Sequence, residues 1–294
     1  MDSIVFEDVW RRHGDRWVVK GLSFAAPAGQ VTALLGRNGA GKSTSIQMLM
    51  GFLRPNSGSI RVLGHESSEL DGELRESIGY VPEDHPHFHG MRIAQVLELE
   101  AGTRRRFDRE LAEARLAEVG LDQRARVSAL SRGMRAQLSI ILALAADPKL
   151  LVLDDPGLGL DPIARREVLE VVIDTLADRG TSVLFTSHVL SDVERLADRV
   201  VVLHEGRAYL DASLDSLRAN VCHGFLSAPE LAPEALLQRP GLLSARRRRG
   251  GLEIYAEDPA ALAALADLGP LETGPCPGLE DLFLGLLSNQ RRSA

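Results

Sequence analysis

The chain has 294 residues, of which 45% are apolar and 26% charged, a composition typical of a globular protein with a substantial core. The formal net charge of -7 argues against nucleic acid as the main partner, because phosphate backbones are bound by basic surfaces. Two cysteines, Cys222 and Cys276, are too few for a disulfide framework. The start MDSIVFEDVW has the pattern of neither a signal nor a transit peptide, and no apolar run approaches the roughly 20 residues that span a bilayer. We therefore expect any membrane role to come through a partner.

The first third of the chain has the apolar pattern of short strands separated by turns. Strands are predicted at residues 3–9, 16–27, 30–35, 59–64 and 77–82. Turn signals lie at His13-Gly14-Asp15 and Pro27-Ala28-Gly29. The third strand runs into a glycine-rich segment, which is followed by the helical pattern IQMLMGF.

From about Met91 to Ala146 the apolar spacing is helical, and after it strands and helices alternate. Strands are predicted at 149–155 and 182–188, helices near 163–178 and 191–197, and a hairpin at 199–211. The alternation predicts an α/β fold with a largely parallel sheet, in which continuous apolar strands such as LLVL are expected. After a boundary near residues 213–221 the composition shifts to Leu, Ala, Pro and Arg, which predicts a small α+β tail. Its predicted elements are a strand at 251–257 and helices at 259–269 and 279–287.

The segment GRNGAGKST follows a strand and opens a helix, which is the context that a phosphate-binding P-loop requires. Its residues are Gly36, Arg37, Asn38, Gly39, Ala40, Gly41, Lys42, Ser43 and Thr44. The glycines let the backbone curl around phosphates, and the helix N-terminus adds its positive end. Lys42 is expected to reach the β- and γ-phosphates, Ser43 to coordinate Mg²⁺ and Thr44 to lie beside the phosphates. A chance glycine-rich turn is the alternative, but the complete pattern predicts binding of a nucleoside triphosphate.

Two adjacent carboxylates, Asp154 and Asp155, end the apolar run LLVL. Neighbouring side chains of a strand point to opposite faces, so the two need different roles. Asp154 is expected to hold Mg²⁺ directly or through water, and Asp155 to meet a water near the γ-phosphate. A solvated loop carboxylate is the alternative for Asp155.

The segment LSRGMRAQL lies between the P-loop and Asp154, and with it residues 3–212 resemble the ATP-binding subunit of an ABC transporter. The resemblance implies a P-loop fold of ABC type over residues 1–212, with an N-terminal antiparallel β-subdomain and a helical subdomain at about 88–146. Residues 213–294 are then an accessory domain. The family's signature motif acts in trans on the γ-phosphate held by the other subunit, and it corresponds here to Ser131, Arg132, Gly133 and Met134. A helix N-cap is the alternative for Ser131.

Three further positions match the family. Gly159-Leu160-Asp161 is similar to its D-loop, which crosses the dimer interface. His188, after the strand SVLFTS, takes the place of the switch histidine that contacts the γ-phosphate, although a lone histidine there is more often structural. His13 takes the place of the aromatic residue that stacks on adenine, with Trp17 as a nearby alternative.

Three departures from the family pattern bear on activity. Asp155 replaces the catalytic glutamate and is shorter by about 1.5 Å; because a misplacement near 1 Å can cost about a hundredfold in rate, slow hydrolysis is a hypothesis. Glu83 replaces the Q-loop glutamine, so it keeps an oxygen ligand for Mg²⁺ and adds a charge. Arg132 and Met134 replace a glycine and a glutamine of the signature. These variants, and the closing segment GLEDLFLGLL, resemble ATPases of ABC-2-type exporters.

Two other patterns have ordinary explanations. His85, His87 and His89 alternate beside Asp84, but Pro86 weakens any fixed metal geometry, and contact with a permease is the preferred interpretation. The arginine runs at 104–106 and 246–249 are interpreted as solvated faces or hairpin tips rather than lipid-binding patches.

These features predict a cytoplasmic ATPase subunit that forms a head-to-tail homodimer around ATP and Mg²⁺. The resemblance implies that it powers a separately encoded permease at the inner face of the cell membrane, through the surface around residues 83–100. Two alternatives stay open: an ATP-gated dimer switch with impaired hydrolysis at Asp155, and a soluble ABC protein that acts on nucleic acid or the ribosome. The acidic balance and the single cassette disfavour the last, so no nucleic-acid partner is expected.

Overall fold

The computed structural model describes residues 2–84, 90–274, 278 and 281–283. The chain divides into two compact units. The first comprises residues 1–188 and 196–211, and the second comprises residues 189–195 and 212–294. Residues 189–195 are therefore separated in sequence from the rest of the unit to which they belong.

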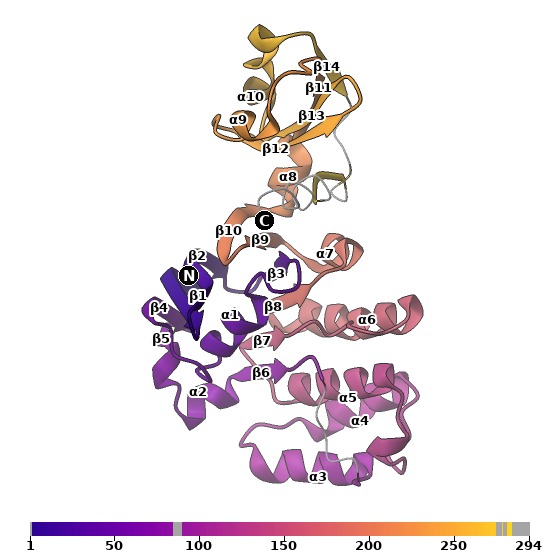
Figure 1. Cartoon of the computed structure of the whole chain (residues 1–294). Helices are drawn as coiled ribbons and strands as arrows, with labels where there is room; N and C mark the ends of the chain where they lie inside the picture. Colours follow the sequence, from indigo (N-terminus) through magenta and orange to yellow (C-terminus); the bar gives the residue numbers. More distant parts are fainter. Residues whose placement is uncertain (1, 85–89, 275–277, 279–280, 284–294) are drawn as a thin grey trace. The chain divides into compact units, whose positions relative to one another are not determined.

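A six-stranded sheet of order β10-β9-β3-β8-β7-β6 runs through the first unit (Figure 1). Its strands are β3 (Val31–Gly36), β6 (Ile78–Val81), β7 (Leu150–Leu153), β8 (Ser182–Ser187), β9 (Arg199–His204) and β10 (Arg207–Ser213). The strands from β9 to β6 in this order pair in parallel. All four residues of β7 and all six of β8 are buried, which explains their continuous apolar sequences. The predicted parallel core sheet is confirmed.

An antiparallel sheet of order β2-β1-β4-β5 is the second layer of strands. Its strands are β1 (Asp2–His13), β2 (Arg16–Pro27), β4 (Ser57–Val62) and β5 (His65–Glu66). The strand predicted at residues 3–9 continues to His13, because the pairing of β1 with β2 resumes after an irregularity between Phe6 and Val9. Asp8 lies in that irregularity with a φ of 45°, as an extra residue in a β-bulge does.

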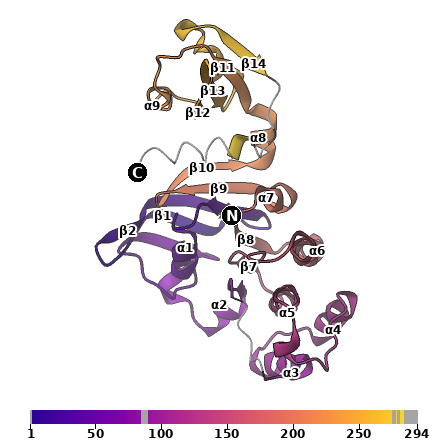
Figure 2. The same cartoon turned by 45° about the vertical axis from the view of Figure 1, so that its right-hand side comes forward.

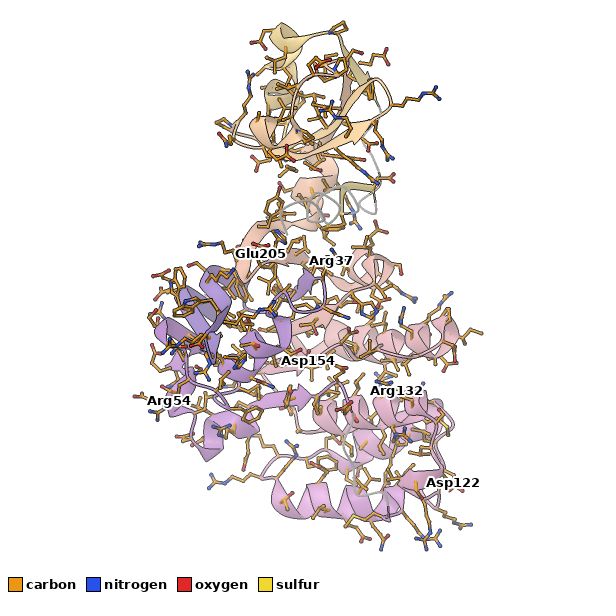
Figure 3. All side chains as sticks on the ribbon, in the orientation of Figure 1. Arg37, Arg54, Asp122, Arg132, Asp154 and Glu205 are labelled. Atoms are coloured by element: carbon orange, nitrogen blue, oxygen red, sulfur yellow. The ribbon has the colours of Figure 1, made fainter. Side chains whose placement is uncertain are left out.

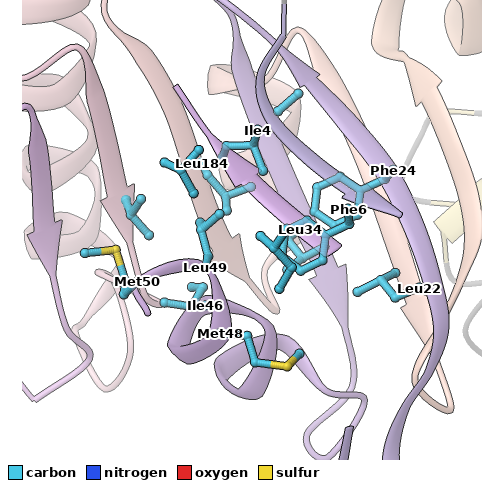
Figure 4. Close-up of a cluster of buried hydrophobic side chains, with 14 of the residues drawn as sticks. Ile4, Phe6, Leu22, Phe24, Leu34, Ile46, Met48, Leu49, Met50 and Leu184 are labelled. Carbon is cyan, nitrogen blue, oxygen red and sulfur yellow. The ribbon is translucent and has the colours of Figure 1, made fainter. Parts of the chain in front are cut away.

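Helix α1 (Lys42–Leu49) and the two sheets share one apolar core (Figure 4). The rings of Phe6 and Phe24 stack with centroids 4.6 Å apart, and Ile46 and Leu49 of α1 are fully buried. Burying a side chain of this size stabilises a fold by about 1.5–3 kcal/mol. Because α1 starts directly after the glycine-rich segment, this core also fixes the orientation of the helix N-terminus.

Three helices, α3 (Ile93–Thr103), α4 (Arg109–Glu118) and α5 (Arg132–Ala145), lie side by side in Figures 1 and 2. Asp108 caps α4 by accepting a hydrogen bond from the backbone N–H of Leu111 at 2.9 Å. The first unit also contains η1 (Ser67–Glu69), α2 (Gly72–Glu76), η2 (Val127–Ala129) and α6 (Pro162–Arg179). Helix α7 (Leu190–Leu196) lies mostly in the second unit.

The second unit contains an antiparallel sheet of order β12-β13-β11-β14 with helices around it, which confirms the predicted α+β tail. Its elements are α8 (Leu214–Asn220), β11 (Cys222–Leu226), α9 (Pro233–Leu236), β12 (Leu242–Arg248), β13 (Gly251–Ala256), α10 (Pro259–Ala263), η3 (Ala266–Leu268) and β14 (Leu271–Gly274). Of the arginine run at 246–249, the first three residues end strand β12, and Arg249 lies in the turn of the β12–β13 hairpin, which agrees in part with the interpretation as a hairpin tip.

One helix of the second unit is shorter than predicted. The pattern at 259–269 gives α10 and then a single turn of 3₁₀-helix, and Gly269 ends it with a φ of 151° that favours glycine. The helix predicted at 279–287 lies outside the described residues except for 281–283.

Four parallel strands direct polar residues to one edge of the central sheet. β3 leads into the P-loop, β6 into Glu83, β7 into Asp154 and Asp155, and β8 into His188. The carboxyl ends of neighbouring parallel strands meet at the same edge, which is where open α/β sheets bind ligands.

Candidate functional site

The P-loop is a tightly curled segment around the side chain of Lys42. The Nζ atom of Lys42 donates to the carbonyl oxygen of Gly36 at 2.6 Å and lies 3.4 Å from that of Arg37. Gly41 precedes α1 with a φ of 108°, a conformation that side chains other than glycine rarely adopt. A Cβ on Gly36 would lie 2.7 Å from the carbonyl oxygen of Leu203, so the loop also needs glycine where it meets β9.

A cavity of about 310 Å³ lies over this loop, which is within the range of small-molecule sites. It collects most of the predicted nucleotide and metal residues from separate strand ends, namely Asn38, Gly39, Gly41, Lys42, Ser43, Thr44, Glu83, Asp154 and Asp155. Gly36, Arg37 and Ala40 belong to the loop but are not part of the lining; the N–H of Ala40 donates to the carbonyl oxygen of Arg37 at 3.0 Å. The cavity also has three lining residues that the sequence analysis missed: Val18, Leu158 and Thr186.

The charged groups of the cavity lie close enough together to influence one another's pKa values. Burial raises the pKa of Asp154, and the negative charge of Asp155 adds to the effect. Burial also raises the pKa of Glu83, followed by repulsion from Asp154 and Asp155. Burial lowers the pKa of Lys42, although the carboxylates of Asp155, Asp154 and Glu83 oppose that change. A bound cation would stabilise the charged forms of Asp154 and Glu83, which burial and neighbouring negative charge disfavour.

Asp154 and Asp155 do have different surroundings, as their adjacent positions require. Asp154 is buried, and its Oδ1 accepts a hydrogen bond from the hydroxyl of Thr186 at 2.9 Å. Asp155 turns away with a φ of 44°, and its Oδ2 lies 2.7 Å from Nδ1 of His188. The structure therefore brings His188 to Asp155 directly, although 33 residues separate them in sequence.

His13 lies beside the P-loop, with its Nε2 atom 3.5 Å from the hydroxyl of Thr44. Trp17, the alternative from the sequence, packs edge-on against Trp10 with ring centroids 5.6 Å apart, and the guanidinium of Arg12 lies 5.9 Å from its ring. Of the two, His13 is the ring that the structure places next to a cavity residue.

The signature and D-loop residues are not part of this cavity lining. Ser131 caps α5 by accepting from the N–H of Met134 at 3.1 Å, which is the N-cap role considered for it. Arg132 lies against the D-loop, because a Cβ on Gly159 would be 2.5 Å from its Nη1 atom. A Cβ on Gly133 would lie 3.0 Å from the Cβ of Ala164, so this position is also tightly packed.

Asp161, the D-loop carboxylate, caps α6. It accepts from the N–H groups of Ile163 at 2.9 Å and Ala164 at 3.0 Å. The possible metal ligands His85, His87 and His89 lie outside the described residues.

The donor set of the cavity fits Mg²⁺. This ion prefers oxygen ligands and is usually held by one or two carboxylates together with substrate phosphates rather than by a protein cage. Asp154 and Glu83 supply carboxylates, and the hydroxyl of Ser43 hydrogen-bonds Asp154. In the described part of the chain, no three His, Cys, Asp or Glu side chains form a group that could hold a metal ion by themselves.

Comparison with known proteins gives the family. The family model for ABC transporters matches residues 19–157. A Nod factor export ATP-binding protein I of Burkholderia orbicola is 35% identical over 264 residues, covering 88% of this chain and 78% of the relative. The chain belongs to the ATP-binding proteins of ABC transporters. A Nod factor export ATP-binding protein I from a Rhizobium species is 35% identical over 302 residues and covers 98% of both chains. The solved structure of an ATP binding subunit of an ABC transporter matches with a TM-score of 0.66 and 29% identity, over 73% of this chain and 91% of that one.

Membership settles the nucleotide and the reaction class. ABC ATP-binding proteins are ATPases, so this chain is an ATPase that binds ATP. It is an ATP-binding subunit of a transport system. None of the helices in residues 2–84 and 90–274 is long and apolar enough to cross a membrane.

Proposed function

We propose that this ABC ATPase dimerises head to tail around two molecules of Mg-ATP and that hydrolysis drives a separate membrane permease. The observation that carries the proposal is that the signature residues are not part of the cavity over the P-loop. Lys42 and Asp154 line the cavity, whereas Ser131 and Gly133 of the signature lie outside its lining. Figure 3 labels Asp154 at the end of β7 and Arg132 at the start of α5. A second subunit would supply a hydroxyl and helix N-terminal N–H donors to the exposed γ-phosphate.

The residues of the cavity have separate roles in binding and hydrolysis. Lys42 and the loop N–H groups bind the β- and γ-phosphates. Ser43, Asp154 and Glu83 hold Mg²⁺, which supplies neutralisation of phosphate charge. Asp155 accepts the proton of the attacking water, and His188 holds the carboxylate of Asp155 in place through the 2.7 Å contact. The ring of His13 packs against adenine.

Export and a membrane permease are proposed from the relatives and from the surface. The two curated relatives are named export ATP-binding proteins. Most of helix α3 belongs to the surface proposed for the permease, around residues 83–100, and its Leu99 is 36% exposed. The protein would then act in the cytoplasm, at the inner face of the membrane. ATP favours the closed dimer because it bridges both subunits, and hydrolysis removes the bridge.

The test is Mg²⁺-dependent phosphate release by the full chain, with dimer formation followed by light scattering in the same samples. Lys42→Ala is expected to lose both turnover and ATP-induced dimerisation. Asp155→Asn is expected to lose turnover and keep a dimer that ATP stabilises. Lys149→Ala removes an exposed lysine and serves as the matched control.

The outcomes separate the proposal from its alternatives. Turnover by a wild-type protein that stays monomeric at every ATP concentration would contradict the dimer. ATP-induced dimerisation without turnover, also in the presence of the permease, would support the ATP-gated switch instead.

A further inference from the structure

Thr186 is a fully buried polar residue at the end of β8, on the strand next to β7. Its hydroxyl donates to Oδ1 of Asp154 at 2.9 Å and accepts from the backbone N–H of Asp155 at 2.7 Å. One side chain therefore contacts both members of the aspartate pair. Nothing in the sequence motifs assigns it a role.

The contact with Asp155 holds an unusual backbone conformation. Asp155 has a φ of 44°, which side chains other than glycine adopt at a cost. Such a conformation persists only where its surroundings fix it, and the hydrogen bond from the N–H of Asp155 to Thr186 is one such restraint. The same turn directs the carboxylate of Asp155 to His188.

The contact with Asp154 fixes a carboxylate that is already buried. A hydroxyl has one proton, and here Oδ1 of Asp154 receives it while the N–H of Asp155 occupies a lone pair. Rotation of the Asp154 carboxylate would break this bond. Its orientation is therefore coupled to the backbone of Asp155 through a single oxygen atom.

We propose that Thr186 is a positioning residue that aligns the carboxylate of Asp154 and the backbone of Asp155 together, so that metal binding and water activation share one geometry. The inference rests on the roles proposed above for these two aspartates. Thr186 would thereby fix the position of Asp155 relative to the carboxylate of Asp154.

The chain offers a matched control for a merely structural role. Thr32 is also fully buried, on the adjacent strand β3, and its hydroxyl has no hydrogen-bond partner among the described residues. Thr32→Val and Thr186→Val make the same isosteric change in the same sheet. Only the second removes bonds to the two aspartates. Thr186→Ser restores the hydroxyl without the methyl group.

The experiment compares these three variants as full chains by kcat, KM for Mg-ATP, melting temperature and the affinity for a fluorescent ATP analogue with Mg²⁺ or with EDTA. Thr186→Val is expected to lower kcat by about tenfold to a hundredfold, as a small misplacement of catalytic groups does. Its KM for Mg-ATP should rise by less than about threefold, because the weaker contribution of Mg²⁺ to binding is small beside the loss in kcat. In Thr186→Val, the gain in ATP affinity that Mg²⁺ confers should be smaller than in wild type. Thr186→Ser should recover most of kcat, and Thr32→Val should have the kcat and the Mg²⁺ effect of wild type.

A Thr186→Val protein with wild-type kcat and a wild-type Mg²⁺ effect on affinity would overturn the inference. So would equal losses in Thr186→Val and Thr32→Val that follow the melting temperature. Lys42→Ala in the same assay keeps the two proposals distinguishable. If phosphate release survives this change, the proposed function is contradicted, whereas the inference on Thr186 is not. If the isolated wild type does not turn over, the Mg²⁺ effect on affinity decides.

Discussion

The two units of the chain each contain a cavity, and these two cavities differ in volume and in the charge of their linings. The cavity of the second unit measures about 590 Å³, against about 310 Å³ over the P-loop. Its described lining includes Cys222, His223, Leu262 and Thr273 but no Asp, Glu, Lys or Arg. The P-loop cavity instead gathers Lys42 and three carboxylates. Volume alone does not locate a functional site; clustered charges held away from water do.

The titratable groups of the two units differ in the same way. In the second unit, burial is the main cause that raises the pKa of Tyr255, to about 12, so this phenol stays neutral at physiological pH. In the first unit, the perturbed groups include a buried lysine and two carboxylates, Asp154 and Glu83, whose pKa values are raised first by burial and then by neighbouring negative charge.

The largest expected effect comes from Asp154→Asn, which keeps the shape of the side chain and removes the proposed metal charge. Mg²⁺-dependent ATP turnover should fall by about 10²–10³, the range for loss of one preorganised electrostatic group. Steady-state phosphate release measured against Mg²⁺ concentration checks this. Turnover that recovers fully at high Mg²⁺ with an unchanged kcat would show that Asp154 contributes affinity alone.

The second-largest effect on turnover is expected from lengthening the side chain of Asp155. Asp155→Glu is expected to raise turnover by about tenfold in the presence of the permease, because a longer side chain reaches the attacking water and about 1 Å of misplacement costs up to a hundredfold. The measurement is kcat of both proteins in the assembled transporter. Wild-type turnover that equals or exceeds that of Asp155→Glu would reject the hypothesis of slow hydrolysis.

A smaller effect on turnover is expected from Glu83 and Arg132, two departures from the family pattern that carry opposite charges. Burial raises the pKa of Glu83, with Asp154 and Asp155 adding to it, whereas the positive charge of Arg132 lowers it. Arg132→Gly and Glu83→Gln should each lower turnover by several-fold, and the double variant should lose less than their product, with a coupling of about 0.5–1 kcal/mol. Arg105→Gly, at an exposed arginine, is the control. Strictly additive losses would show that the two residues act independently.

The smallest effect on nucleotide chemistry is expected in the second unit. Leu262 is 3% exposed and lines the larger cavity, so Leu262→Ala should lower the free energy of unfolding of this unit by about 2–4 kcal/mol. The affinity for Mg-ATP should stay at the wild-type value. Chemical denaturation and ATP titration of the same samples measure both, with the partly buried Leu268→Ala as a milder control. A large loss of ATP affinity would show that this cavity bears on the nucleotide site.

Prediction from the sequence was most accurate where the pattern is local. The strand at 16–27 is β2 to the residue, and the helix near 163–178 is α6, because Pro162 and Gly180 mark its ends. It was poorest in the second unit. β12 carries three arginines in its last positions, yet these residues pair with β13, a partner that a run of charged residues does not reveal. In the structure, Arg248 pairs with Glu253 at 2.9 Å, and Arg247 donates to the carbonyl oxygen of Pro229 at 2.7 Å.

The sequence by itself determined the P-loop, the aspartate pair and the order of strands that present them, because glycine spacing and apolar runs act over a few residues. Only the tertiary structure decided which side chains share the cavity. Thr186 joins it because parallel pairing sets the end of β8 beside the end of β7, and the φ of 44° at Asp155 directs that carboxylate to His188. Contacts between residues more than 30 positions apart depend on how strands align, and no local pattern encodes that alignment.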